Sequence, residues 1–340
     1  MTPRIVKLVA EIDEFKGYWK GMASLSPRTL SSLRVLSTIE SIGSSTRIEG
    51  AQLSDREVST LLRGLDTHPF QTRDEQEVVG YARAMQRIHD SYGEINLTEN
   101  SIKYLHKVVM QFSAKDSWHL GEYKKHPNHV AAFDSNGNQI GIIFETATPL
   151  DTPRMMELLV EKTQLRFQDE NIHPLLTIAD FVVRFLAIHP FQDGNGRLSR
   201  ILTNLLLLRN GYAFVLYSSH ERIVEANKDQ YYLSLKESQE KLKSQSHFAM
   251  PWAEFFLELL KKQKDHLKEK IEREKKVYKV PDLSEKISKL ASEHGRITVS
   301  FISSELQANR NTVKKHLHQL VTIGRIVRHG KGRGTYYSSF

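Results

Sequence analysis

Residues 175–208 read LLTIADFVVRFLAIHPFQDGNGRLSRILTNLLLL, and this stretch decides the fold. The part that ends at Ile188 and the part that begins at Leu198 are apolar on nearly every face of a helix. A helix that is apolar all round lies at the centre of a core, because no face of it suits water. The sequence therefore predicts a helical domain in which two central helices hold the polar loop 189–197 between them.

The glycines of this loop predict a binding site for an anion. Gly194 and Gly196 flank Asn195 where the second helix begins, so the backbone can turn sharply and leave N–H groups bare. The N-terminus of a helix also carries a partial positive charge, which favours phosphate. Arg197 and Arg200 lie three residues apart in the first turn, where both can bind further phosphate oxygens.

Two other side chains of the loop predict chemistry on that anion. Asp193 supplies one hard carboxylate oxygen, which suits Mg²⁺ that is shared with phosphate oxygens and water. His189 ends the first helix and is a natural general base for a hydroxyl that attacks phosphorus. Each feature alone is common at helix ends and turns. Their combination within twelve residues indicates phosphoryl or nucleotidyl transfer.

Residues 189–200, HPFQDGNGRLSR, resemble the signature of Fic-domain proteins, H-P-F-x-D-G-N-G-R-x-x-R, at every fixed position. The resemblance extends over about 75–245. It implies a mainly α fold, a Fic helical core with a β-hairpin flap. It also implies a protein adenylyltransferase that moves AMP from ATP, with Mg²⁺, to a Ser, Thr or Tyr hydroxyl of a target protein or of itself.

The same resemblance implies roles for single residues. His189 would deprotonate the target hydroxyl, Phe191 would anchor the loop in the core, and Asp193 would hold Mg²⁺ on the α- and β-phosphates. A tyrosine pair after the core resembles the pair that lines the family's nucleotide pocket, although two core aromatic residues would give the same pattern. The implied nucleotide-binding residues are Gly194, Asn195, Gly196, Arg197, Leu198, Arg200, Tyr231 and Tyr232.

Residues 129–144, HVAAFDSNGNQIGIIF, predict a β-hairpin, because two short apolar runs flank the turn 134–138. This hairpin resembles the flap of the family. The resemblance implies that a target protein docks on residues 130–144 by adding a strand.

Residues 45–50, STRIEG, match a second motif of the family, [S/T]-x-x-x-E-[G/N], which lies on an inhibitory helix. In the family, the glutamate of this motif pairs with the arginine that corresponds to Arg200. A carboxylate and a γ-phosphate compete for the same guanidinium. Ser45 and Glu49 are therefore the implied inhibitory residues. The alternative is a solvated glutamate before a glycine that ends a helix.

Basic residues are concentrated near the C-terminal end. The net charge is +8, and residues 261–340 hold 19 Lys and Arg against 8 Asp and Glu. The pattern of residues 281–340 predicts a helix, a short strand at 297–299, a helix capped by Ser300, a helix over 312–321 and a hairpin. This is the order of a small winged helix-turn-helix domain.

The outward face of the last predicted helix and the tip of the hairpin are polar and basic, which favours contact with DNA phosphates. A winged helix that contacts protein is the alternative. The candidate DNA-binding residues are Asn311, Lys314, Lys315, Lys331 and Arg333.

The chain is expected to have four parts: an N-terminal helical region with the inhibitory helix (1–95), the Fic catalytic core (96–250), a helical linker (251–280) and the winged helix (281–340), which begins at Pro281. Cysteine is absent from the sequence, which excludes disulfides, thiolate metal sites and cysteine nucleophiles. Apolar runs are too short for a membrane span, and the start lacks a signal-peptide pattern. We therefore expect a cytoplasmic protein without a membrane partner, and a homo-oligomer is compatible with the sequence.

Two other functions also agree with the sequence. The same loop could remove AMP, or transfer phosphate or another nucleotide, although the complete motif with Arg197 and Arg200 favours AMP transfer. A nucleotide-sensing, DNA-binding regulator is the alternative from another class. His189 argues against this regulator, because sensing requires no base.

Overall fold

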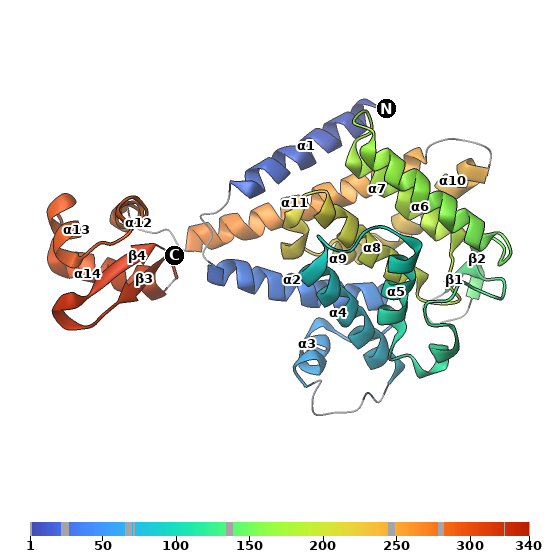
Figure 1. Ribbon diagram of the computed structural model, residues 1–340, viewed down its shortest axis with the longest axis horizontal. Helices are drawn as coiled ribbons and strands as arrows, with labels where there is room; N and C mark the ends of the chain where they lie inside the picture. Colours follow the sequence, from blue (N-terminus) through green and yellow to red (C-terminus); the bar gives the residue numbers. More distant parts are fainter. Residues whose placement is uncertain are drawn as a thin grey trace. The chain divides into compact units, whose positions relative to one another are not determined.

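The computed structural model describes residues 2–21, 27–64, 70, 72–133, 139–243, 249–277, 282–322 and 324–339. Over these residues the chain is mainly helical, as the sequence predicts (Figure 1). The chain divides into two compact units. The first consists of Met1–Lys20 and Arg34–His266, and the second of Gly21–Leu33 and Leu267–Phe340.

The helices of the first unit begin where the sequence offers capping residues. Ser54 and Glu57 form a capping box before Asp55, and the Thr98 side chain accepts the Ser101 N–H at the start of the helix that follows it. Before the loop the elements are α1 (Pro3–Lys20), α2 (Pro27–Ile48), α3 (Asp55–Arg63), α4 (Arg73–Ser91), α5 (Glu99–Met110), the 3₁₀ helix η1 (Ala114–His119), α6 (Thr152–Gln168) and α7 (Pro174–Ile188). After it come α8 (Asn195–Arg209), the 3₁₀ helix η2 (Ala213–Tyr217), α9 (His220–Ala226), α10 (Lys228–Lys243) and α11 (Met250–Val277).

The helices α7 and α8 form the centre of the first unit, which confirms the prediction from their apolar residues. Every residue of α8 from Arg197 to Leu208 is buried. This helix contacts α4, α5 and α7, and α7 contacts α6 in turn. The loop between α7 and α8 is therefore fixed at both ends by the core.

The predicted hairpin consists of the antiparallel strands β1 (His129–Phe133) and β2 (Gln139–Glu145). His129 lies opposite Glu145, and the register shifts twice along β1. The turn predicted at 134–138 lies outside the described residues. Of the helices, α10 contacts β2.

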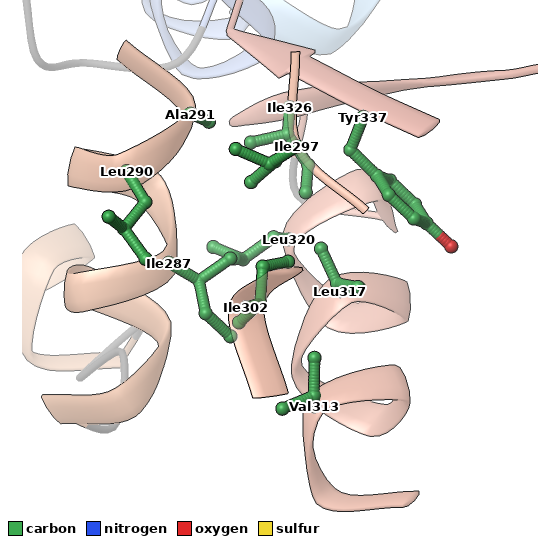
Figure 2. Packing of buried hydrophobic residues seen from close by; sticks show 10 residues of the cluster. All are labelled: Ile287, Leu290, Ala291, Ile297, Ile302, Val313, Leu317, Leu320, Ile326 and Tyr337. Carbon is green, nitrogen blue, oxygen red and sulfur yellow. The ribbon is translucent and has the colours of Figure 1, made fainter. Parts of the chain in front are cut away.

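Over residues 282–322 and 324–339 of the second unit, three helices and a two-stranded antiparallel sheet surround a core of their own. The elements are α12 (Asp282–His294), α13 (Val299–Glu305), α14 (Arg310–Thr322), β3 (Ile326–His329), the 3₁₀ helix η3 (Gly332–Gly334) and β4 (Tyr336–Ser339). Figure 2 shows the side chains that fill this core from all of the helices and both strands. The buried residues are Ile287, Leu290, Ala291, Ile297, Ile302, Val313, Leu317, Leu320, Ile326 and Tyr337.

This element order agrees with the order predicted for a winged helix, with two corrections. The strand expected at 297–299 is a single bridge from Ile297 to Tyr337. The cap of α13 is Thr298 instead of Ser300, because the extended Thr298 places its hydroxyl where it accepts the Phe301 N–H at 3.3 Å. The assignment as a winged helix stays a prediction, and the boundary predicted at Pro281 lies outside the described residues.

The predicted linker 251–280 shows no break over its described residues, because α11 runs as one helix through Val277. Within the described ranges, none of the helices has the length and apolar character needed to cross a membrane.

Candidate active site

His189 lies at the C-terminal end of α7 in a left-handed conformation, with a φ of 52°. Its N–H donates to the Phe185 carbonyl oxygen at 2.9 Å. The ring Nδ1 lies 3.3 Å from the Leu186 carbonyl oxygen, so Nδ1 carries the hydrogen and Nε2 can accept a proton. Burial and the Lys124 ammonium lower the pKa of His189 to about 4. The imidazole is therefore neutral near pH 7, as a general base requires.

Phe191 anchors the loop, as expected. Its side chain is fully buried, and its ring stacks on His106 with the ring centroids 3.9 Å apart. Asn195 holds the Phe191 main chain from both sides, since Oδ1 accepts the Phe191 N–H at 2.9 Å and Nδ2 donates to the Phe191 carbonyl at 2.7 Å. The side chain of Asn195 therefore maintains the loop, and a phosphate contact of Asn195 stays a prediction, for which its main-chain N–H is available.

At Gly194 an added side chain would be strained, and at Gly196 it would displace the Glu49 carboxylate. Gly194 has a φ of +79°, in the left-handed region. A Cβ on Gly196 would lie 2.1 Å from Glu49 Oε1. The Leu198 N–H donates to the Gly194 carbonyl at 2.9 Å as the first bond of α8, and a role of Leu198 in nucleotide binding stays a prediction. The N–H groups of residues 195–197, which precede that bond, are the ones that can face an anion.

Asp193 lies at the exposed side of the loop and fits a divalent cation that is shared with a nucleotide. Its Oδ1 accepts the Gly194 N–H at 2.6 Å, and its Oδ2 lies 3.0 Å from Arg73 Nη2. Burial alone would raise the pKa of Asp193. Arg197, the Gly194 N–H and Arg73 outweigh this effect and lower the pKa below its usual value, so the carboxyl is ionised.

The donor set around Asp193 suits Mg²⁺ that arrives with phosphate. In the described part of the chain, no cluster of three or more His, Cys, Asp or Glu side chains could hold a metal ion. Mg²⁺ commonly takes one or two carboxylates and fills its remaining positions with phosphate oxygens and water. A single ionised carboxylate beside a helix N-terminus therefore fits this ion.

Arg200 is enclosed by the last turns of α2. Its Nε donates to Ser45 Oγ at 2.8 Å, and its Nη2 donates to the Ser45 carbonyl at 2.9 Å and to Glu49 Oε1 at 2.8 Å. Burial lowers the pKa of Arg200, but Glu49 raises it above its usual value, so the guanidinium is charged. The structure thus brings Ser45, Glu49 and Arg200 together, as the sequence motif implies.

Arg197 is buried and takes part in ion pairs within the protein. Its Nη1 lies 3.2 Å from Glu77 Oε2, and its Nη2 lies 3.5 Å from Asp193 Oδ1. Glu77 is a partner of Arg197 that the sequence pattern did not reveal.

Tyr231 and Tyr232 form an edge-to-face pair on α10, with ring centroids 5.2 Å apart. Burial raises the pKa of Tyr231 to about 12, and the charges of Arg200 and Glu49 also act on it. The tyrosine pair thus lies close to the Arg200–Glu49 ion pair. Tyr231 also packs against Trp252, so it belongs to the core as well as to the site.

Two further residues support the loop from the segment before the hairpin. Lys124 is 3% exposed, and its Nζ donates to the Ile188 carbonyl at 2.9 Å. Asn128 Nδ2 donates to the Phe191 carbonyl at 2.8 Å. Both lie in GEYKKHPNHV (121–130), whose polar composition suggests a surface loop. Their contact with main-chain atoms on both sides of His189 emerges only from the fold.

The candidate DNA-binding residues of α14 are exposed, namely Asn311, Lys314 and Lys315. A shallow hollow of about 580 Å³ lies along this helix. Lys331 is exposed beside η3, and the side chain of Arg333 lies outside the described residues. The residues that line the hollow are Asn311, Thr312, Lys315, His316 and Gln319.

Comparison with known proteins supports the domain assignment. Residues 96–207 match the model of the Fic/DOC family. The chain is 29% identical over 183 residues to the protein adenylyltransferase Fic of Drosophila erecta, a match that covers 52% of this chain and 34% of that protein. It is 30% identical over 164 residues to the protein of the same name from Drosophila mojavensis, covering 48% of this chain and 29% of that protein. The chain thus spans about a third of the length of these relatives.

The crystal structure of a Fic family protein from Desulfovibrio desulfuricans G20 shares the fold. Its TM-score is 0.64 at 24% identity, and the match covers 100% of this chain and 97% of that one. The family match contains the whole loop from His189 to Arg200, together with α7 and with α8 as far as Leu207. The chain therefore contains a Fic/DOC domain, which spans residues 96–207.

Proposed function

We propose that this Fic/DOC domain is a protein adenylyltransferase that moves AMP from ATP to a protein hydroxyl. The observation that carries the proposal is the placement of a neutral His189, with Nε2 able to accept a proton, at one end of a loop whose other end is a helix N-terminus. A proton acceptor and an anion site thus lie within one short segment. Relatives that carry the name protein adenylyltransferase support the same reaction.

In the proposed reaction His189 Nε2 takes the proton of the target hydroxyl, and the oxygen forms a bond to the α-phosphorus. The bond from the α-phosphorus to the bridging oxygen breaks, and pyrophosphate leaves with the electron pair. The N–H groups at the start of α8 hold phosphate oxygens, and Arg200 binds the γ-phosphate when Glu49 releases it. Asp193 would hold Mg²⁺, which would neutralise part of the phosphate charge.

The contact between Glu49 and Arg200 supports a proposal of autoinhibition. Glu49 Oε1 occupies the Nη2 donor of Arg200, so a γ-phosphate must displace it to bind there. Ser45 holds the same guanidinium through two further bonds, which keep it on the α2 side of the site. In this state ATP binds in a pose that leaves its α-phosphorus poorly placed for the target hydroxyl.

Labelled ATP tests the reaction class. With ATP labelled at the α-phosphorus, protein should become labelled, whereas label at the γ-phosphorus should not be retained. Retention of γ-label would indicate phosphate transfer, and loss of AMP from pre-labelled protein would indicate AMP removal. Absence of α-label from both the wild type and Glu49→Gly, with ATP still bound, would favour a nucleotide sensor and overturn the proposal.

The hairpin supports a proposal for target docking. In the described part of the chain, β1 and β2 form a sheet of two strands, and β1 follows the segment 121–128, which contacts the main chain beside His189. A strand of the target that pairs with this sheet would present its hydroxyl group close to His189.

We propose DNA binding as a separate function of the second unit, because basic side chains are exposed along α14. From Val299 onward this unit carries seven Lys and Arg and one Glu in its sequence. Asn311, Lys314 and Lys315 are exposed, and a hollow follows the same helix. A helix with an exposed polar and basic face suits the major groove, and its lysines suit the phosphates.

Binding of mixed-sequence DNA by the full chain tests this second function. The Lys314→Ala/Lys315→Ala double variant should weaken binding and reduce its salt dependence, because two phosphate contacts are lost. Lys286→Ala/Lys289→Ala is the matched control, since both lysines are exposed on α12 of the same unit. Equal binding by both double variants, or no affinity at low salt, would favour a protein partner instead.

A further inference from the structure

Arg73 joins the start of α4 to the exposed carboxylate of the loop. Its Nη2 lies 3.0 Å from Asp193 Oδ2, and its Nε donates to Glu77 Oε1 at 2.8 Å. The position of Arg73 is set locally, because the Thr72–Glu75 capping box fixes the first turn of α4. Arg73 is therefore held at the carboxylate that is suited to Mg²⁺, although 120 residues separate the two in the chain.

These residues belong to a closed ring of alternating charges. Glu77 contacts Arg73 through Oε1 and Arg197 through Oε2, and Arg197 approaches Asp193 at 3.5 Å. One half of the ring is buried, since the side chains of Arg197 and Glu77 are 2% and 9% exposed. The other half is open to solvent, since those of Arg73 and Asp193 are 50% and 38% exposed. Asp193 and Arg73 therefore form the half of the ring that an ion from solution can reach.

We propose that Arg73 is a positioning residue that competes with the divalent cation for Asp193. The inference rests on the proposed function, in which that cation accompanies ATP. A guanidinium on Oδ2 occupies the oxygen that a cation needs, and its charge repels a dication nearby. When a cation binds, Arg73 leaves Asp193 but stays paired with Glu77. The wild-type enzyme thus has a restraint at the metal carboxylate that is separate from Glu49, which acts on Arg200.

The alternative is a structural ion pair that only ties α4 to the loop. A structural pair would change the melting temperature on removal and leave cation affinity unaltered. Competition predicts that removal of Arg73 changes the cation affinity and leaves the melting temperature nearly unaltered, because an ion pair this exposed adds little to stability. Cation affinity is therefore the property that distinguishes the two.

The test uses Mn²⁺ alone as the probe, without nucleotide, and the full chain. Binding is measured from the electron paramagnetic resonance signal of free Mn²⁺. Arg73→Gln should bind Mn²⁺ more tightly than wild type, on the order of 3- to 10-fold. Arg73→Lys, which keeps the charge, should fall between them. Arg83→Gln is the matched control, because Arg83 is exposed on the same helix.

A second variant locates the ion. Asp193→Asn in the Arg73→Gln background should remove the added Mn²⁺ binding, since the ion has then lost its carboxylate. Equal Mn²⁺ affinity in wild type and Arg73→Gln, weaker affinity in Arg73→Gln, or absence of binding in both would overturn the proposal. So would a gain that survives Asp193→Asn. The proposed AMP transfer is tested separately with labelled ATP, so failure of one proposal does not hide failure of the other.

Discussion

Glu49 Oε1 lies 2.8 Å from Arg200 Nη2, although 151 residues separate the two in the chain. The contact depends on the backbone of both partners. Glu49 follows the last turn of α2, and Gly196 allows its carboxylate to approach the start of α8 because any Cβ there would collide with it. The carboxylate therefore occupies the place where an anion held by α8 and Arg200 would bind. Its removal should free Arg200 to bind that anion.

His189→Ala should reduce AMP transfer by about 10²- to 10⁴-fold, because the variant lacks the base that takes the hydroxyl proton. The measurement is labelling from α-labelled ATP in the Glu49→Gly background, where transfer is fast enough to follow. ATP affinity by calorimetry should stay within a few-fold, which serves as the control for folding. Labelling that stays within a few-fold of the His189-containing protein would remove His189 from the role of base.

Asp193→Ala should abolish the Mg²⁺ dependence of ATP binding, because the cation then has no protein carboxylate. Calorimetric titrations with and without Mg²⁺ should differ for the wild type and coincide for the variant. The same Mg²⁺ dependence in both proteins would mean that the cation is held elsewhere.

Two histidines with lowered pKa values predict how stability depends on pH. Burial lowers the pKa values of His106 and His189 to about 4, below the usual value near 6.5. Between these values the unfolded chain binds more protons than the folded one. Their contribution to stability is therefore complete above about pH 6.5 and is lost as the pH falls toward 4, by up to about 1.4 kcal/mol per pH unit for each histidine.

Histidine NMR and thermal unfolding check this expectation together. The ring signals of His106 and His189, assigned with single Gln variants, should not titrate between about pH 7.5 and 5.5. The melting temperature should fall as the pH drops from about 6.5 toward 4. Titration of both rings near pH 6.5 would show that their pKa values are not lowered. His189 would then be partly protonated below pH 7, against the prediction that it is neutral there.

Local sequence signals predict the parts of the fold that depend on neighbours in the chain. The apolar residues of α7 and α8 indicate the central helices, and the Ser54–Glu57 and Thr98 caps indicate where two others begin. The loop is equally local, because its glycines, base and carboxylate lie within a few residues of one another. The Glu49 motif could be linked to Arg200 only through the family resemblance.

The roles that the sequence does not reveal all depend on contacts between distant segments. Arg73 and Glu77 look like ordinary residues near the start of a helix, yet they contact the loop carboxylate and Arg197. Lys124 looks like a surface lysine, yet it is buried and donates to the Ile188 carbonyl. Asn195 looks like a ligand for phosphate, yet its amide is bound to Phe191. Residue type and spacing cannot distinguish these cases, because the partner lies on another element.

The rate of AMP transfer by Glu49→Gly, compared with wild type, tests the central claim most directly. Release of Arg200 lets the γ-phosphate bind, and correcting a misplacement of about 1 Å at the α-phosphorus is worth on the order of 10²-fold in rate. Glu49→Gln, which keeps the size but loses the charge, should be intermediate. Arg200→Ala should stay slow, alone or with Glu49→Gly, because the partner of the γ-phosphate is missing. The account predicts strong self-labelling from α-labelled ATP by Glu49→Gly, with a smaller change in ATP affinity; a rate no higher than that of the wild type would contradict it.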